Sequence, residues 1–562
     1  VPAFVAAAEQ AAARGGAVEA ANAWEAAARL TGSETDRRRY RAEAARGFMR
    51  AGAGPQAEAV LRELIADAPG EAASARWRQA LAVVRMWTEC VPPPDGEELR
   101  RLGSRLLEGS GPGEAATGTE LLVALAHCHQ AAGDYRAAGA VTELIRRRVP
   151  KSSLTLEQRL CCDMVAVMTG AGGRLLRSDW VDRFDWGRSF DPDVPVGMFG
   201  TVLGWIDEVA TGERVLERCR AAAERAPGGV VAQVTVGAMS AMLLQHTGQW
   251  PRALLEFAAC ERTALDSDFL APYPFIALRR AYLLAAQGKA AECDELRARA
   301  ASIAPHWTPA YRHLDGCTEG LLRLASGEPA EAARVLEEAG RVEAEMGIVV
   351  SGYTSRFPDL FEARWWLDGA AAMRGPLEEF ASAAERMAHP TMAATAARCR
   401  ALLAEPAGLD EAFAAALALH RRSPVVFEEA RTRLLWGQRL RRARRKADAR
   451  KQLRAAETLF DRLDAVAWAE RARSELAACG ERRARAEDAP HLPITRLTPR
   501  EFEVAREVAA GATNSEAAGR LFVSKRTVEY HLSNAYRKLG VTDRRRLAEL
   551  FEGPETARRN GP

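Results

Sequence analysis

The sequence predicts an all-α protein in which a long stack of helix pairs, an α-solenoid, precedes a small domain of four helices. From residue 1 to about 480, alanine, leucine, arginine and glutamate dominate, and apolar residues recur at helical spacing between short glycine-containing breaks. A charged segment with prolines follows, and after it come four short helical patterns with clear start and stop signals. With 562 residues the chain is too long for one compact core, which favours repeats or several domains.

The glycine-containing breaks share one frame. A glycine ends one helix, and a small residue five positions later lets the next helix pack closely, as at Gly133 and Ala138 or Gly248 and Ala253. Equivalent small positions are Ala57, Ala138, Ala253, Cys293, Ala332 and Ala449. The first and last of these are 392 residues apart, or ten intervals of roughly 39 residues. The offsets resemble those of the tetratricopeptide repeat and predict about eleven or twelve stacked helix pairs in residues 1–479.

Curved helical arrays bind peptides, partner domains or small ligands. We therefore expect residues 1–479 either to receive a small-molecule or protein signal, or to serve as a scaffold whose aromatic residues are core. Residues 177–197 fit the repeat poorly and are read as a loop or a distorted repeat. Five tryptophans could line a ligand surface, although tryptophan at helical spacing is mostly packing. They are Trp180, Trp186, Trp307, Trp365 and Trp366.

Catalytic and metal signals are absent from the sequence, so we expect no enzyme, no metal site and no cofactor in this chain. No GxxxxGK[ST] phosphate loop, GxSxG, HExxH or strand-bound GxGxxG occurs. His127, Cys128 and His129 are consecutive, so on a helix their side chains diverge by about 100° and cannot share one metal ion. The cysteines are scattered, as in reduced cytoplasmic proteins. No apolar run approaches the ~18 residues of a membrane span.

The arginine-rich run of residues 439–451 overlaps a repeat frame. We read it first as the solvated face of an ordinary repeat, with a supplementary contact to DNA or an acidic partner as the alternative.

The last part of the chain reads as a linker, residues 480–495, followed by a four-helix domain, residues 496–562. Thr498 with Glu501, and Thr513 with Glu516, have the spacing of capping boxes for the first two helices. Ser524 caps a longer third helix that ends at Gly540. Thr542 or Asp543 begins the fourth helix. A short helix, a tight turn and a longer helix are typical of a helix-turn-helix.

The stretch LTPREFEVAREVAAGATNSEAAGRLFVSKRTVEYHLSNAYRKLGV resembles the LuxR-type DNA-binding domain. Ala517 stands where that family usually has isoleucine. The preceding repeats resemble those of the large ATP-binding LuxR-type regulators, in which a P-loop ATPase comes first. This sequence has no such loop, so ATP would be a cofactor only if an ATPase domain lies upstream of Val1. The resemblance implies a bacterial, cytoplasmic transcription regulator, an activator by expectation, bound to promoter DNA on the nucleoid.

The third helix has two faces. Val528, Leu532, Ala535 and Leu539 form one apolar stripe that must face the other helices. On the opposite face, Glu529, Tyr530 and Ser533 are the candidates for contact with base edges. The candidates for phosphate contact are Lys525, Arg526, Thr527, Asn534, Arg537 and Lys538.

The resemblance also implies partners. The fourth helix of LuxR-type domains commonly pairs two copies, so Leu547, Leu550 and Phe551 are candidates for a homodimer interface. RNA polymerase is a plausible further partner. Two alternatives remain: a partner-binding solenoid scaffold, and the C-terminal part of an ATP-dependent switch whose ATPase lies upstream.

Overall fold

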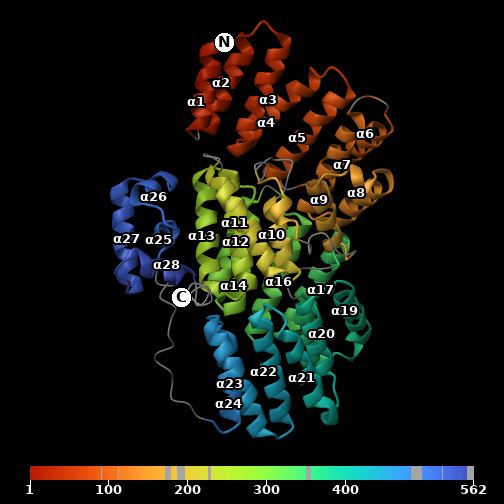
Figure 1. Cartoon of the computed structure of the whole chain (residues 1–562). Coiled ribbons are helices and arrows are strands. Elements are labelled where there is room, and N and C mark those ends of the chain that lie inside the picture. Colours follow the sequence, from red (N-terminus) through yellow and green to blue (C-terminus); the bar gives the residue numbers. More distant parts are fainter. Residues whose placement is uncertain are drawn as a thin grey trace.

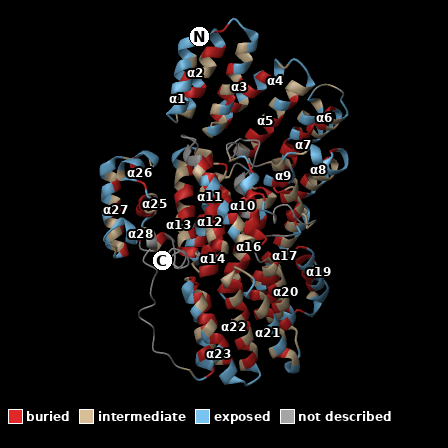
Figure 2. Cartoon of the chain, in the orientation of Figure 1, coloured by how far each residue is buried: buried red, intermediate tan, exposed pale blue. Residues whose placement is uncertain are grey.

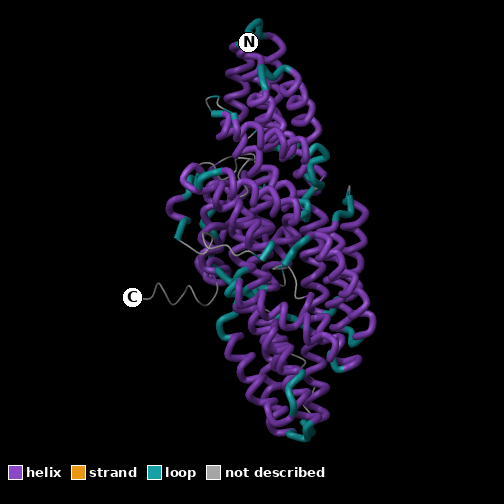
Figure 3. Tube along the Cα trace, turned by 90° about the vertical axis from the view of Figure 1, so that its right-hand side faces the viewer, coloured by secondary structure: helices purple, strands orange, loops and turns teal. Residues whose placement is uncertain are grey.

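The computed structural model describes residues 1–14, 16–89, 91–109, 111, 113–170, 179–186, 196–225, 230–304, 306–349, 356–481, 497–521 and 523–552. Within these ranges the regular structure is helical, and no strand occurs (Figure 3). The predicted all-α class is therefore confirmed. None of the described helices is both long and apolar enough to cross a membrane. The predicted linker lies outside the described residues from residue 482 onward.

Helices α1–α24 form a tetratricopeptide-like array in which most helices pack on their neighbours in sequence (Figure 1). The first half comprises α1 (Pro2–Ala13), α2 (Ala17–Leu30), α3 (Glu34–Arg50), α4 (Gly54–Ala66), α5 (Glu71–Glu89), α6 (Gly96–Glu108), α7 (Glu114–Ala131), α8 (Tyr135–Arg148), α9 (Leu156–Met168), α10 (Val196–Trp205), α11 (Val209–Arg225) and α12 (Val230–His246). The second half comprises α13 (Trp250–Asp266), α14 (Tyr273–Gln287), α15 (Ala290–Ile303), α16 (Pro309–Ala325), α17 (Pro329–Met346), α18 (Arg356–Asp368), α19 (Arg374–Arg386), α20 (Pro390–Leu402), α21 (Leu409–His420), α22 (Val426–Arg442), α23 (Lys446–Arg462) and α24 (Val466–Ala478).

The small residues that define the repeat frame lie buried within the array. Ala57, Ala138, Ala253, Cys293, Ala332 and Ala449 are all fully buried. Gly133 and Gly248 adopt left-handed backbone angles, with φ of +83° and +76°, directly after α7 and α12. Because other residues rarely adopt this conformation, glycine permits the tight turn that brings the next helix back against its partner.

The array also closes on itself, so helices far apart in sequence touch. Arg136 on α8 donates to the carbonyl oxygen of Ala344 on α17 at 2.8 Å. The Lys289 ammonium and the Asp464 carboxylate are 2.9 Å apart, which joins the start of α15 to the turn before α24. These contacts tie the successive turns of the array together.

Buried ion pairs connect α18, α20 and α22. Arg431 on α22 is fully buried and donates to the carboxylates of Asp359 and Glu362 on α18. Arg398 on α20 is also fully buried and pairs with Glu428 on α22. Burial, together with the nearby Glu428 carboxylate, opposes ionisation of Asp359 more strongly than Arg431 favours it, so the pKa of Asp359 is raised. This charged cluster fixes how α18, α20 and α22 pack.

The five tryptophans singled out from the sequence mainly pack within the array. Trp180 is fully buried and lies against Phe184 and Phe199. Trp365 and Trp366 lie under the guanidinium of Arg442, within the arginine-rich run. Three other arginines of that run contact neighbouring repeats: Arg439 with the carbonyl oxygens of Leu402 and Ala404, Arg441 with Glu475, and Arg445 with Asp410.

Candidate nucleic-acid interface and its contact with the array

Four capped helices form the C-terminal domain beside α13 (Figure 1). They are α25 (Pro499–Ala509), α26 (Asn514–Arg520), α27 (Lys525–Leu539) and α28 (Arg544–Glu552). Thr498 accepts a hydrogen bond from the backbone N–H of Glu501, whose carboxylate accepts from the N–H of Thr498 at 2.8 Å. Thr513 and Glu516 make the same reciprocal pair. Both predicted capping boxes are therefore present, and they fix where α25 and α26 begin.

The apolar stripe of α27 faces inward, as predicted. Val528, Leu532, Ala535 and Leu539 are at most 6% exposed. They pack with residues of α25 and α26, including the fully buried Phe502 and Ala517. Ser524 caps the helix through the N–H of Thr527, and Gly540 ends it with φ of +68°. The packing of this stripe fixes the rotation of α27, which leaves its polar face in solvent.

The side chains assigned to base edges all lie on this solvent face. Glu529, Tyr530 and Ser533 are exposed, and Tyr530 is 65% exposed, the largest apolar exposure on the helix. Its ring contacts that of His531, with ring centres 5.3 Å apart, and the rest of it faces solvent. Of the residues assigned to phosphates, the structure places Lys525, Arg526 and Arg537 in solvent and leaves Thr527, Asn534 and Lys538 half-buried.

Several of these polar groups have partners within the domain. Lys538 donates to Glu501 at 2.6 Å, and Arg537 donates to the side-chain oxygen of Asn534 at 2.7 Å. Burial opposes ionisation of Glu501, but the Lys538 ammonium and the Thr498 N–H outweigh it and lower the pKa of that carboxyl. Glu501 therefore holds Lys538 in place, and its carboxylate partly neutralises the charge of the Lys538 ammonium.

The residues proposed for dimerisation have mixed positions. Leu547 is fully buried and Phe551 is 7% exposed, and both pack in the core of the domain, where Phe551 stacks on Phe502 with ring centres 5.5 Å apart. Leu550 is partly exposed. Pairing of two copies through α28 therefore stays a prediction, and of the three side chains Leu550 is the one that reaches the surface.

The domain docks on the array through α25 and α13, a contact that the sequence did not indicate. Arg506 on α25 forms an ion pair with Glu256 on α13, whose side chain is 4% exposed. Burial opposes the charge of Arg506, but the carboxylates of Glu256 and Glu507 outweigh it and raise the pKa of the guanidinium. Leu255, next to Glu256, packs against the core of the domain, and Arg262 lies 3.9 Å from Glu503.

The docked surface and the predicted DNA-binding face are on different sides of the domain. The contact to the array is made by α25, whereas Tyr530 and its neighbours on α27 stay exposed (Figures 1 and 2). Docking therefore holds the domain without covering the exposed face of α27.

A capped helix, a tight turn and a longer helix with one exposed polar face define a helix-turn-helix domain of the DNA-binding class. Residues 495–551 match the family "Bacterial regulatory proteins, luxR family". The C-terminal domain is therefore a LuxR-family helix-turn-helix domain, and it follows a helical repeat array as in the large regulators of that family.

Related proteins carry the names of transcription regulators. The "Putative HTH-type transcriptional regulator Mb0914c" of Mycobacterium bovis is 41% identical over 99 residues, which is 18% of this chain and 9% of that protein. The "Nitrate/nitrite response regulator protein homolog" of Haemophilus influenzae is 42% identical over 59 residues, which is 10% of this chain and 28% of that protein. These matches thus span less than a third of either relative.

One solved structure, titled "Crystal Structure of Rap Protein Complexed with Competence and Sporulation Factor", aligns with 80% of this chain and 98% of its own at 12% identity. Its TM-score is 0.25, so it supports no statement about this protein.

Proposed function

We propose that this protein is a sequence-specific transcription regulator, an activator, that binds promoter DNA through the exposed face of α27. The observation that carries the proposal is the combination of a fully buried apolar stripe and an exposed polar face on one capped helix. Between Arg520 and Arg546 the chain has eight basic and two acidic side chains, which favours a polyanion as partner. Such a regulator acts in the cytoplasm, on the nucleoid.

The proposed roles within this face follow from side-chain chemistry. Glu529 accepts from cytosine N4, and Ser533 suits several base edges. Lys525, Arg526 and Arg537 meet phosphates, which fixes the position of the helix in the major groove. A glutamate near phosphates weakens binding to all DNA, so its benefit is rejection of wrong sequences.

The α13–α25 contact supports control of the domain by the array. An ion pair between Arg506 and the buried carboxylate of Glu256 gives the array a preferred position for the DNA-binding domain. A ligand that moved α13 would shift the equilibrium between the docked and the released domain, by an amount set by the difference in its affinity for the two states. We propose that the array receives such a signal, and that two copies bind DNA as a homodimer that recruits RNA polymerase.

Selection from random-sequence duplexes tests the function directly. The full chain is incubated with a pool of random duplexes at two salt concentrations, and the bound DNA is sequenced. The proposal predicts enrichment of a defined sequence, with half-sites spaced by the symmetry of the dimer. Retention of DNA without any enriched sequence would reduce the function to non-specific binding, and no retention at low salt would refute it.

A further inference from the structure

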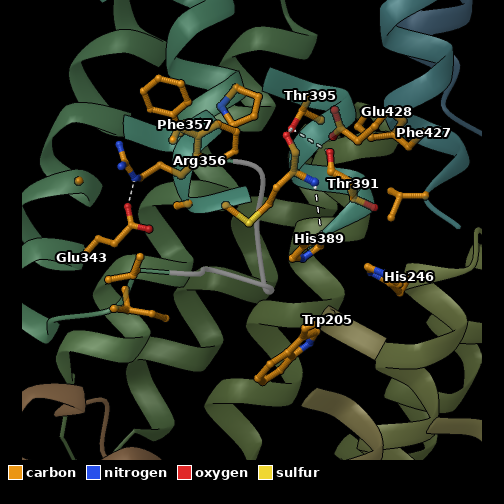
Figure 4. Close-up of a pocket in the computed structure, with 18 of the residues that line it drawn as sticks. Trp205, His246, Glu343, Arg356, Phe357, His389, Thr391, Thr395, Phe427 and Glu428 are labelled. Carbon is orange, nitrogen blue, oxygen red and sulfur yellow. Dashed lines mark hydrogen bonds and ion pairs between the residues drawn. The ribbon is translucent and has the colours of Figure 1, made fainter. Parts of the chain in front are cut away.

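The described residues line a cavity of about 890 Å³ that is partly open to solvent, between α10, α12 and α14 on one side and α17–α20 and α22 on the other (Figure 4). Protein interiors are close-packed, with few voids larger than a water molecule. A space of this size lies within the range of small-molecule binding sites. Helix packing alone therefore does not explain it.

Two aromatic pairs make up much of the apolar wall. Phe357 stacks on Phe380 with ring centres 4.7 Å apart and planes inclined by 22°. Trp250, at the start of α13, lies 5.1 Å from Phe427. Trp205 adds a third aromatic surface on the far side of the cavity from Phe357 (Figure 4). Flat aromatic surfaces on opposite walls suit a ligand with a flat apolar body.

Hydrogen bonds hold the polar part of the wall in one arrangement. Asp207 accepts from the backbone N–H of Thr391 at 2.7 Å and from its hydroxyl at 3.0 Å. The same carboxylate lies 2.9 Å from a ring nitrogen of His246 and 3.1 Å from one of His389. These bonds join the turn after α10 to α20, 184 residues later in the sequence, and His246 adds the end of α12 to the same group. The site is thus pre-formed rather than dependent on a ligand for its shape.

Three of the glutamates that line the cavity are paired with arginines of the protein. Arg356 pairs with Glu343, Glu428 pairs with the buried Arg398, and Glu378 pairs with Arg400. The wall contains three arginines and four glutamates, so neither sign dominates. A ligand with a net charge would lose part of its hydration on entry and would face both signs of charge on the wall, which gives it little compensation. Because neither sign of charge dominates the wall, the cavity favours an uncharged ligand over a charged one.

We propose that this cavity binds a small uncharged aromatic compound as the signal of the array. The proposal rests on the regulatory function inferred above. Its structural link to the DNA-binding domain is α13: Trp250 at the first position of this helix lines the cavity, and Glu256 six residues later holds Arg506. Six residues of helix span about 9 Å, so occupation of the cavity acts on the same helix that docks the domain.

The test uses the full chain and the uncharged fluorescent probe N-phenyl-1-naphthylamine, whose emission rises in apolar sites. We expect saturable binding in the wild type, at least tenfold weaker binding in Ala344→Trp and in Ser382→Trp, and no change in Ala330→Trp. Ala344 and Ser382 line the cavity and are exposed, so a larger side chain can enter the space without displacing buried residues. Ala330 lies on the same helix as Ala344, outside the cavity.

Displacement of the probe tests the chemical class. Indole-3-acetamide should displace it at no more than a tenth of the concentration needed for indole-3-acetate or tryptamine, which share the ring but carry a charge. Equal or better displacement by a charged compound would refute the class, and displacement by apolar peptides alone would assign the cavity to a peptide. Probe binding that is absent, or unaffected in both cavity variants, would refute the site.

The DNA selection described above separates the two proposals. Enrichment of a DNA sequence by a chain that fails to bind the probe refutes the cavity alone. Probe binding by a chain that retains no DNA refutes the regulatory function and leaves the cavity without a proposed role as its signal site.

Discussion

Removal of the ion pair between Arg506 and Glu256 should release the DNA-binding domain from the array. In Arg506→Met the Glu256 carboxylate, 4% exposed, would stay buried without its cation unless the domain moves away. Losing one partner of a fully buried pair costs roughly 3–5 kcal/mol. Because the Arg506 side chain is 29% exposed, we expect about 1–3 kcal/mol, which lowers the docking equilibrium about 5–150-fold.

Hydrogen–deuterium exchange of the full chain measures this release. In Arg506→Met, peptides from α13 and α25 should exchange faster, while those from α22 and α23 keep their wild-type rates. The double variant Glu256→Gln, Arg506→Met should recover part of the protection, because no unpaired charge remains at the contact. Asp266→Asn, at the exposed end of α13, is the control for loss of a surface charge on that helix and should leave its exchange unchanged. Unchanged exchange of α13 and α25 in Arg506→Met would refute the docked arrangement as a stable state.

Three further predictions concern the array. Ala332→Leu should destabilise the array by about 1–3 kcal/mol, because the larger side chain overpacks a fully buried position. Ala330→Leu, at an exposed position of the same helix, should change the stability by no more than about 0.5 kcal/mol. Equal melting temperatures for the two variants would contradict the repeat frame. Arg431→Met leaves two buried carboxylates without their main cation and should cost about 3–5 kcal/mol in urea unfolding; a wild-type midpoint would show that the cluster contributes little. Burial opposes ionisation of Asp207, yet two histidines outweigh it and lower its pKa, so its contribution to stability is complete above the unfolded pKa of about 4 and is lost as pH falls further. Between pH 4 and lower pH, the melting temperature of the wild type should therefore fall more steeply than that of Asp207→Asn. Parallel plots of melting temperature against pH for the two proteins would contradict this.

The local features of the DNA-binding domain could be predicted because they depend on near neighbours in sequence. Thr498 and Glu501 meet within one helical turn, and the stripe from Val528 to Leu539 follows the helical period. The small residues of the array are predictable for a related reason. Each lies at a fixed distance from a glycine, and close helix contacts admit only small side chains. Fold class and helix faces follow from such short-range regularities.

The contacts between distant segments could not be predicted in the same way. Glu256 and Arg506 are 250 residues apart, and no pattern in either helix distinguishes an inter-domain ion pair from a solvated charge. The burial of Leu547 and Phe551 could not be predicted, because the sequence of an amphipathic helix is the same whether its apolar face meets a second copy or its own domain. Here that face packs on Phe502. Likewise, Trp205 and Trp250 line the cavity, whereas the tryptophans chosen from sequence do not.

DNA recognition by α27 is tested most directly with variants of two exposed residues of this helix. The affinity of each variant for the selected DNA and for a scrambled duplex is measured at a series of salt concentrations. Arg537→Ala should weaken binding to both duplexes about equally and reduce the slope of log affinity against log salt by about 1. Glu529→Ala should leave that slope nearly unchanged and narrow the difference between the duplexes by about 1–3 kcal/mol. If both variants bind both duplexes with wild-type affinity and slope, α27 does not read DNA through this face.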